Sequence, residues 1–457
     1  MSFSHVMMRA IRNPALAAAT ILLTLAACTG DSTVTGPTPI APPSVRQVPL
    51  SGTVVTNPAT LAGFVKRGAN RAIPLVRPTA VSPSIVRRSV AGVTTAARQG
   101  NALQLVLDVE VEPPVVDGKV LQATHIAAAG GRVYVTYAMI GEGTAGAIDV
   151  FDLGTGSTST VAAVVAATSD TRLIARMTFA ATEYYAVTAT DDALYVVGAS
   201  DDPELTERAV LDVYGLRDGI FDSKPAFRRI ALPSFAGTGV HVQNGLVWAT
   251  SGSGGPNVGG VTVFAERDFS VIARETYSDA RAVHGAGRYV VVLTGTPGGA
   301  MVFDAGNAQY VAKPFVVGGA TVPESKGSAW VEGNWAFLGA GDGGVRVFGI
   351  AGSRPIINGE GIPTPEVRGV PRELSTTNAV TTNGSGLVFT ANGEAGVLVY
   401  TSDYLSLRPG VTRAAPRFDL LGALDFGEKI SANFIASSEK QLFVASGLGG
   451  LKILRIQ

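Results

Sequence analysis

From about Gln104 onward, the chain repeats one unit: a small apolar strand, a turn, a strand with a central aromatic residue, a glycine-rich turn and an apolar strand. Val133-Tyr134-Val135 followed by Ile148-Asp149-Val150-Phe151 illustrates the last two strands. Seven copies can be laid out at a spacing of about 40 to 60 residues, which suits four strands per unit. Because such a small sheet can bury its faces only against neighbouring sheets, the repeat predicts an all-β fold, a β-propeller of seven blades.

The last copy has only three strands before Gln457, and a separate strand-like run, Leu105 to Val111, precedes the first copy. Pairing that run into the last blade would cover an open sheet edge and close the ring. We therefore expect a propeller over residues 101–457, closed by its N-terminal strand. Helix should be minor, because no stretch shows amphipathic 3.6-residue periodicity over three turns.

Composition supports a folded body and divides the chain by charge. A chain that is 46% hydrophobic and 16% charged can bury a large core, which excludes disorder throughout. The first 100 residues carry ten basic residues and one acidic residue, Asp31, so the remainder is acidic. An acidic body argues against nucleic acid as a partner.

The N-terminus has the pattern of an export signal. Arg9 and Arg12 precede a short apolar run, Ala15 to Leu25, which is too short to cross a bilayer. The run ends in Leu25-Ala26-Ala27-Cys28, which resembles the lipobox of bacterial lipoproteins. The resemblance implies that residues 1–27 are a signal peptide and that Cys28 is lipidated. An ordinary signal peptide with an incidental Cys28 is the alternative.

Two segments follow the lipobox. Residues 28–49 are rich in Thr, Pro, Ser and Gly, which predicts a flexible tether. Residues 50–100 contain basic residues and no acidic residue. One interpretation is a basic arm that binds anionic lipid or an acidic partner. The other is a solvated linker that wraps the acidic body. We favour the linker.

The residue after Cys28 bears on the destination of the protein. In lipoproteins an Asp after the cysteine favours inner-membrane retention, so Thr29 implies the outer membrane.

The repeat resembles the LVIVD-type repeats of bacterial surface propellers. The best matches are residues 340–348, Ala-Gly-Asp-Gly-Gly-Val-Arg-Val-Phe, and residues 391–400, Ala-Asn-Gly-Glu-Ala-Gly-Val-Leu-Val-Tyr. The Asp that this family places after the third strand is clear only at Asp152 and Asp304. The resemblance implies the fold rather than an activity.

Two motifs have ordinary structural interpretations. Residues 141–146 and 339–344 match G-x-G-x-x-G, but each lies between two expected strands, whereas a dinucleotide site needs a strand before it and a helix after it. We interpret both as turns. An acidic cluster could hold a hard cation through carboxylate oxygens, although we favour a solvated loop. Its members are Asp201, Asp202, Glu204 and Glu207.

Aligning the copies on the aromatic strand places mostly polar residues at the start of each innermost strand. Propeller geometry would bring these positions to one mouth of the central channel, as a candidate binding site or as a water-filled funnel. Arg281 should dominate recognition of an anionic group, because its planar fork donates two parallel hydrogen bonds. The seven positions are His125, Tyr185, Gly239, Arg281, Ser328, Asn378 and Asn433.

The sequence contains no complete catalytic constellation. His125, His241 and His284 lack metal-binding spacing, no Ser lies in a G-x-S-x-G elbow, and Cys28 is the single cysteine. The function hypothesis is therefore a non-enzymatic, monomeric binding or scaffolding module, anchored by lipid in the cell envelope, without a cofactor and with catalytic residues unknown.

The alternative is a metal-assisted hydrolase or lactonase with Ca²⁺ in the channel. Its oxygen ligands would be Glu183, Asn378 and Asn433. Calcium-dependent propeller lactonases are similar in principle, but they usually have six blades and more acidic ligands.

Lipidation can be tested directly. Cys28→Ala removes the thiol that carries the acyl chains, each of which contributes roughly 0.8 kcal/mol per buried methylene to membrane affinity. We expect the variant to leave the membrane fraction or to remain unprocessed, as measured by fractionation and mass spectrometry. Unchanged membrane association and mass would show that Cys28 is not the anchor.

Overall fold

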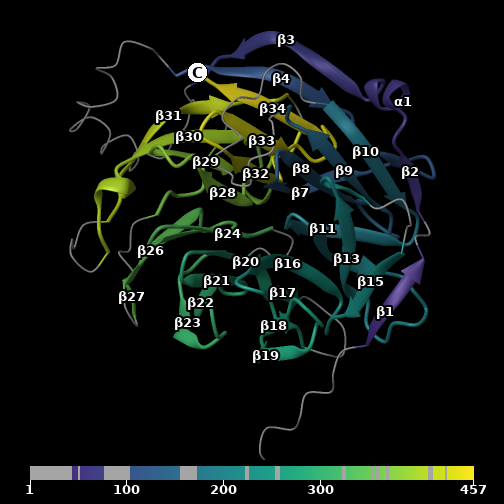
Figure 1. Cartoon of the computed structure of the whole chain (residues 1–457). Helices are drawn as coiled ribbons and strands as arrows, with labels where there is room; N and C mark the ends of the chain where they lie inside the picture. Colours follow the sequence, from purple (N-terminus) through teal and green to yellow (C-terminus); the bar gives the residue numbers. More distant parts are fainter. Residues whose placement is uncertain are drawn as a thin grey trace, which may run out of the picture. The chain divides into compact units, whose positions relative to one another are not determined.

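The structure is a computed structural model that describes residues 44–49, 52–76, 103–154, 172–221, 226–252, 258–321, 326–351, 354–356, 361–366, 370–409, 415–427 and 430–457. All of them belong to one compact unit, Pro42–Gln457. The fold is a seven-bladed β-propeller, as the repeat predicted (Figure 1). Cys28 and the signal segment lie outside the described residues.

Blades 1 to 3 follow each other along the chain. Each is an antiparallel sheet whose first strand is innermost. The strands of blade 1 are β7 (Gln122–Ala129), β8 (Arg132–Ala138), β9 (Gly146–Asp152) and β10 (Arg172–Phe179). Those of blade 2 are β11 (Thr182–Ala189), β12 (Ala193–Ser200), β13 (Ala209–Arg217), β14 (Ile220–Phe221) and β15 (Ala226–Ala231). Those of blade 3 are β16 (Ala236–Gln243), β17 (Leu246–Gly252), β18 (Gly260–Ala265) and β19 (Val271–Thr276).

Blades 4 to 7 continue the ring. Blade 4 contains β20 (Ala280–Ala286), β21 (Tyr289–Thr294), β22 (Gly299–Asp304) and β23 (Tyr310–Val316). Blade 5 contains β24 (Ser328–Glu332), β25 (Trp335–Gly339), β26 (Val345–Ala351) and β27 (Arg354–Ile356). Blade 6 contains β28 (Ala379–Thr382), β29 (Leu387–Ala391), β30 (Val397–Ser402) and β31 (Phe418–Leu424). Blade 7 contains β32 (Phe434–Ser437), β33 (Gln441–Ala445) and β34 (Leu451–Ile456), and it takes its fourth strand from elsewhere.

That fourth strand is β4 (Leu105–Val111), which pairs antiparallel with β34, Leu451 opposite Val111 and Ile456 opposite Leu105. The expected ring closure by an N-terminal strand is therefore confirmed. Small elements complete the described chain: the hairpin β5 (Val115–Val116) and β6 (Lys119–Val120), α1 (Pro58–Ala62), and the 3₁₀ turns η3 (Arg372–Leu374) and η4 (Tyr404–Ser406).

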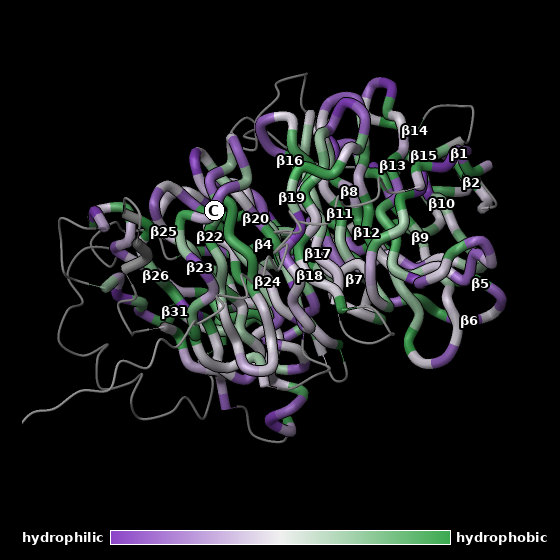
Figure 2. The backbone as a smooth tube through the Cα atoms, turned by 90° about the horizontal axis from the view of Figure 1, so that it is seen from below, coloured by the Kyte–Doolittle hydropathy of each residue, from purple (hydrophilic) through white to green (hydrophobic). Residues whose placement is uncertain are grey.

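The core lies between blades rather than within them. The buried hydrophobic residues of the described chain form seven clusters, and each cluster joins two neighbouring blades. Trp248 and Val261 of blade 3 pack with Val283 and Met301 of blade 4, for example. Figure 2 shows the strands as largely hydrophobic and many connecting turns as hydrophilic. Each blade is therefore stabilised by its two neighbours.

The segment before the propeller follows the outer edges of the blades. β1 (Val45–Pro49) pairs with β15 of blade 2, β2 (Thr53–Val55) with β10 of blade 1, and β3 (Val65–Ile73) with β4 of blade 7. Val76 then bridges Ala423 on blade 6. We call residues 45–76 the strap. It takes in the end of the expected tether and part of the expected linker, and the sequence analysis had assigned no strands there.

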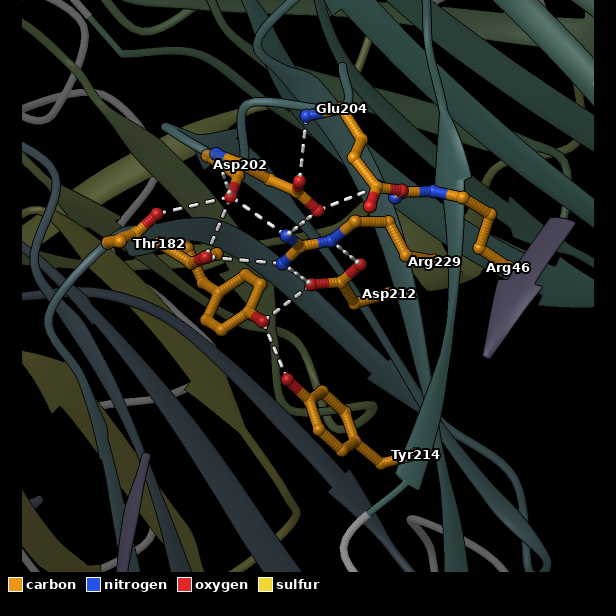
Figure 3. Close-up of polar contacts among 10 residues, drawn as sticks. Arg46, Thr182, Asp202, Glu204, Asp212, Tyr214 and Arg229 are labelled. Atoms are coloured by element: carbon orange, nitrogen blue, oxygen red, sulfur yellow. Dashed lines mark hydrogen bonds and ion pairs between the residues drawn. The ribbon is translucent and has the colours of Figure 1, made fainter. Parts of the chain in front are cut away.

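Arg46 of the strap joins an ion-pair network that extends into the core of blade 2 (Figure 3). Arg229 donates to both carboxylate oxygens of Asp212 at 2.9 and 2.7 Å, and the Tyr184 hydroxyl donates to Asp212 at 2.7 Å. Asp202 accepts from Arg229 at 3.2 Å and from Arg46 of β1 at 2.7 Å. Glu204 is the second partner of Arg46, so two members of the acidic cluster are paired with the strap.

Blade 1 has a matching arrangement. Arg176 donates to both oxygens of Asp149 at 2.8 Å, and Tyr137 donates to Asp149 at 2.9 Å. The strap contributes Phe64, whose ring centre lies 4.4 Å from the Arg176 guanidinium. Lys66 and Glu112 form an exposed ion pair beside it. The strap therefore covers the buried ion pairs of two successive blades.

Deletions should separate the contributions of the strap and of β4. Removing residues 1–43 should leave stability unchanged. Removing residues 1–78 should give a folded but less stable domain, because the added edge strands and the buried Leu61 of α1 are lost while the ring stays closed. Removing residues 1–112 also deletes β4, whose five buried aliphatic side chains each contribute about 1.5–3 kcal/mol. We expect that protein to aggregate, as judged by thermal melting and size-exclusion chromatography. Equal stability of the last two proteins would contradict this account.

Candidate functional site

All seven expected mouth residues lie on the innermost strands or immediately before them. His125 is on β7, Tyr185 on β11, Gly239 on β16, Arg281 on β20 and Ser328 on β24. Asn378 immediately precedes β28, and Asn433 immediately precedes β32. These inner strands pack against one another in ring order, so residues far apart in sequence come together around one axis.

Cross-strand pairing shows that the seven residues occupy two adjacent columns. In blades 1 to 4 the pairing of the innermost strand shifts by one residue at a β-bulge, and Thr124, Tyr185, Thr238 and Arg281 are the residues skipped. Tyr185, Arg281, Asn378 and Asn433 belong to this bulge column. His125, Gly239 and Ser328 belong to the next column, where they pair with Thr136, Thr250 and Gly339.

Four members of the bulge column bond the next blade through their side chains. The hydroxyls of Thr124 and Thr238 donate to the backbone carbonyls of Tyr184 and Ala280 at 2.8 and 2.6 Å. The amides of Asn378 and Asn433 donate to the carbonyls of Ala432 and Ala123 at 3.1 and 2.9 Å. These contacts join blades 1 to 2, 3 to 4, 6 to 7 and 7 to 1. Much of the polar character at this mouth is therefore structural.

Within a blade, the bulge residue also contacts the residue two positions earlier. The Tyr185 hydroxyl donates to Glu183 at 2.5 Å, and burial raises the pKa of the Glu183 carboxyl. Arg281 forms an ion pair with Asp279 at 2.9 Å and donates to Thr296 at 3.4 Å. The Arg281 fork therefore already faces a carboxylate of its own strand.

The three candidate calcium ligands come from blades 2, 6 and 7, and each has a protein partner. Glu183 accepts from Tyr185, the Asn378 oxygen accepts from Thr376 at 3.4 Å, and the Asn433 oxygen accepts from Ser431 at 2.9 Å. Among the residues that the structure describes, no group of three His, Cys, Asp or Glu side chains could hold a metal ion.

Both G-x-G-x-x-G matches lie between two strands, as expected for turns. Gly341 and Gly344 lie between β25 and β26 with φ of 55° and 73°, a backbone region that favours glycine. Gly341 also exchanges backbone hydrogen bonds with Thr377, immediately before the Asn378 position of blade 6. The glycine turns therefore contact the next blade at the same mouth as the bulge column.

Deeper along the axis, three aromatic side chains on successive blades form an arc. His241, His284 and Trp330 occupy equivalent positions on β16, β20 and β24, opposite Trp248, Val291 and Phe337. The His241 and His284 rings are 5.2 Å apart, and His284 stacks on Trp330 at 4.6 Å. We call these three residues the aromatic arc.

Partial exposure of the arc defines a central channel. All three side chains are partly exposed, although each inner strand is flanked by neighbouring blades. Their exposed surface therefore faces the axis. The same position is Ala127 in blade 1 and Ala436 in blade 7, so packing alone does not require an aromatic residue there. In blades 1 and 7, outside the arc, the ring centres of His125 and Phe434 are 3.7 Å apart.

The imidazoles of His125 and His284 are neutral and present one donor each. Each Nδ1 accepts a backbone N–H, from Val187 at 3.4 Å and from Val331 at 3.0 Å, which leaves the proton on Nε2. Burial, and secondarily the Lys326 ammonium, lower the pKa of His125 to about 3. Burial likewise lowers the pKa of His241 to about 4 and that of His284 well below its usual value.

A shallow pocket of about 160 Å³ lies elsewhere, between blades 5 and 6. Glu332 and Trp335 of blade 5 form one side, and Tyr404 and Leu405 of η4 form the other. Its residues do not include the seven mouth positions or the aromatic arc.

His241 and His284 were expected only to lack metal-binding spacing, and Trp330 and Lys326 were not among the expected site residues. A fixed spacing in the sequence could have identified part of the arc. His241 and His284 each lie three residues after the bulge residue of their blade.

Neither a family model nor a curated protein matches the chain. Solved structures that resemble it include the Dos1 propeller, with 12% identity, a TM-score of 0.45, and coverage of 86% of this chain and 96% of that chain. The WD40 β-propeller domain of Doa1 has 11% identity, a TM-score of 0.45 and coverage of 75% and 96%. A catalytically inactive virginiamycin B lyase from Staphylococcus aureus, solved with quinupristin, has 9% identity, a TM-score of 0.46 and coverage of 77% and 99%.

The three histidines predict how stability depends on pH. Because their folded pKa values lie below the unfolded value near 6.5, the unfolded chain binds more protons between about pH 6.5 and 4. Stability is therefore fully present above pH 6.5 and falls on acidification, by up to about 1.4 kcal/mol per pH unit per histidine. Glu183, with its raised pKa, acts in the opposite direction.

Denaturant unfolding measured from pH 7.5 to 4.5 checks this dependence. His284→Asn keeps an acceptor near the Nδ1 position but cannot titrate. The free energy of unfolding of this variant should therefore decline less steeply with acidification than that of the wild type, because one fewer proton is taken up on unfolding. Parallel curves for the two proteins would contradict the assignment.

Proposed function

We propose that the protein is a lipid-anchored binding module of the cell envelope, and that its ligand or partner enters the central channel. The observation that carries this proposal is the aromatic arc, which exposes His241, His284 and Trp330 toward the axis where blades 1 and 7 have alanine. Binding sites are commonly concave places where apolar walls meet a few convergent polar groups. The channel mouth above the arc likewise brings polar groups from several blades together.

The N-terminal pattern supports anchoring at a membrane. Leu25-Ala26-Ala27-Cys28 and Thr29 favour an outer-membrane lipoprotein whose body faces the periplasm or the cell surface. In the described part of the chain, no helix is long and apolar enough to cross a membrane. Residues 29–44 separate Cys28 from β1, and a fully extended segment of that length reaches at most about 55 Å. A monomeric body would thus stand close to the bilayer.

Binding is favoured over catalysis by the contacts of the polar groups. Glu183, Asn378 and Asn433, the residues that a calcium-dependent hydrolase would use, are each engaged by a neighbouring hydroxyl. The imidazoles of His125 and His284 each accept a backbone N–H at Nδ1, which orients them as donors rather than as bases.

A channel-filling substitution tests the proposal. Ala436→Trp places an indole at the position that Trp330 occupies in blade 5, and it should fill the channel without altering the mouth. We expect a small-molecule extract of bacterial envelopes to raise the melting temperature of the wild type but not that of this variant. Ile272→Trp, at a half-exposed position on the outer strand β19, is the matched control and should respond like the wild type.

Native mass spectrometry of the same samples should show a bound mass with the wild type and the control only. Equal binding by Ala436→Trp, or efficient turnover of an extract component, would contradict a binding function for the channel.

A further inference from the structure

Lys326 carries a buried ammonium for which the described residues provide no counterion. Its ammonium nitrogen is buried and has no hydrogen-bond partner among the described residues. Burial lowers the pKa of Lys326 to about 8, and no described carboxylate acts on the group to raise it. At pH 7 roughly nine-tenths of the side chain is still protonated. Burying an ammonium that has no partner among the described residues is unfavourable, and an anion bound beside it would offset this.

The position of Lys326 places the residue at the channel mouth, two residues before Ser328, which begins the inner strand β24. Lys326 precedes β24 of blade 5, whereas His125, whose pKa it lowers, lies on β7 of blade 1. Blades 1 and 5 are not neighbours in the ring, so this interaction crosses the axis. Burial, His241 and then His125 lower the pKa of His284 in blade 4. Lys326, His125 and His284 therefore converge on the channel from three separate blades.

The three groups present donors toward the channel. Lys326 has three N–H donors, and His125 and His284 each have an Nε2–H because their Nδ1 atoms are occupied. Among the described residues, three carboxylates on or next to the inner strands are already engaged: Asp279 with Arg281, Glu183 with Tyr185, and Glu332 with Thr382. A cation surrounded by donors, next to an aromatic wall, is complementary to an anion with an apolar body.

From this arrangement we infer that the central channel is a binding site for a small organic anion, a carboxylate or a phosphate, which Lys326 neutralises and the His125 and His284 Nε2–H groups orient. The inference deepens the proposed function by naming the chemical class of ligand. Trp330, stacked on His284, is the wall for the apolar part of the ligand. This assignment replaces Arg281, whose guanidinium is paired with Asp279, as the expected anion-binding residue.

Benzoate, phenyl phosphate and inorganic phosphate are the probes, and neutral benzamide is the control ligand. Isothermal titration calorimetry at pH 7 should show binding of at least one anion to the wild type and none of benzamide. The preferred probe distinguishes a carboxylate from a phosphate site. Lys326→Gln removes the charge and keeps a polar side chain, and it should weaken that binding at least tenfold. Lys313→Gln, at an exposed position on β23, should bind like the wild type.

Lys326→Gln should also melt at a higher temperature than the wild type without ligand, since an unpaired buried charge is removed; this shows that its loss of binding is not a loss of fold. The anion should raise the melting temperature of the wild type and of Lys313→Gln only. Equal affinity of Lys326→Gln and wild type, or no binding of any of the three anions, overturns the inference. If the envelope extract still stabilises Lys326→Gln but not Ala436→Trp, the channel binds a ligand of another class and only the anion assignment fails.

Discussion

The fold depends on one strand pairing, that of β4 with β34. Every blade buries its faces only against its neighbours. Without β4, blade 7 would lack its fourth strand, and the hydrophobic clusters that it shares with blades 1 and 6 would both be incomplete. Leu105 and Leu107 face blade 6, and Val109 and Val111 face blade 1. A single strand from before the first blade thus completes two interfaces. The cost is the closure of a loop that spans nearly the whole domain.

Closure of the ring also determines how polar side chains are used around the axis. At the start of each inner strand the backbone approaches the next blade, and a β-bulge in blades 1 to 4 interrupts the regular ladder. Backbone carbonyls there need donors, which Thr124, Thr238, Asn378 and Asn433 supply. Among the described residues, the Lys326 ammonium has no such role, and it is the group that we propose for ligand binding.

The strap follows the outside of this ring. From β1 to Val76 it runs along blades 2, 1, 7 and 6 in that order, and it ends near the position from which β4 enters blade 7. Its contacts are backbone ladders together with Arg46 on Asp202 and Phe64 over Arg176, side chains that belong to the buried ion pairs of blades 2 and 1. The basic charge of the segment is thus partly neutralised by the acidic body.

The sequence by itself determined the blade count, the four-strand unit, the closing strand and the turn role of the glycine motifs, because each depends on local patterning and on the requirement to bury sheet faces. It placed the mouth residues on the correct strands but mixed two columns, since a bulge adds a residue without changing the hydrophobic pattern. It assigned no strands to the strap, because edge strands such as Val45–Pro49 bury too little surface to leave a clear pattern. Only the tertiary structure decided that Arg281 is paired with Asp279 and that His284 stacks on Trp330 of the next blade, since contacts between blades depend on distances that no spacing along the chain encodes.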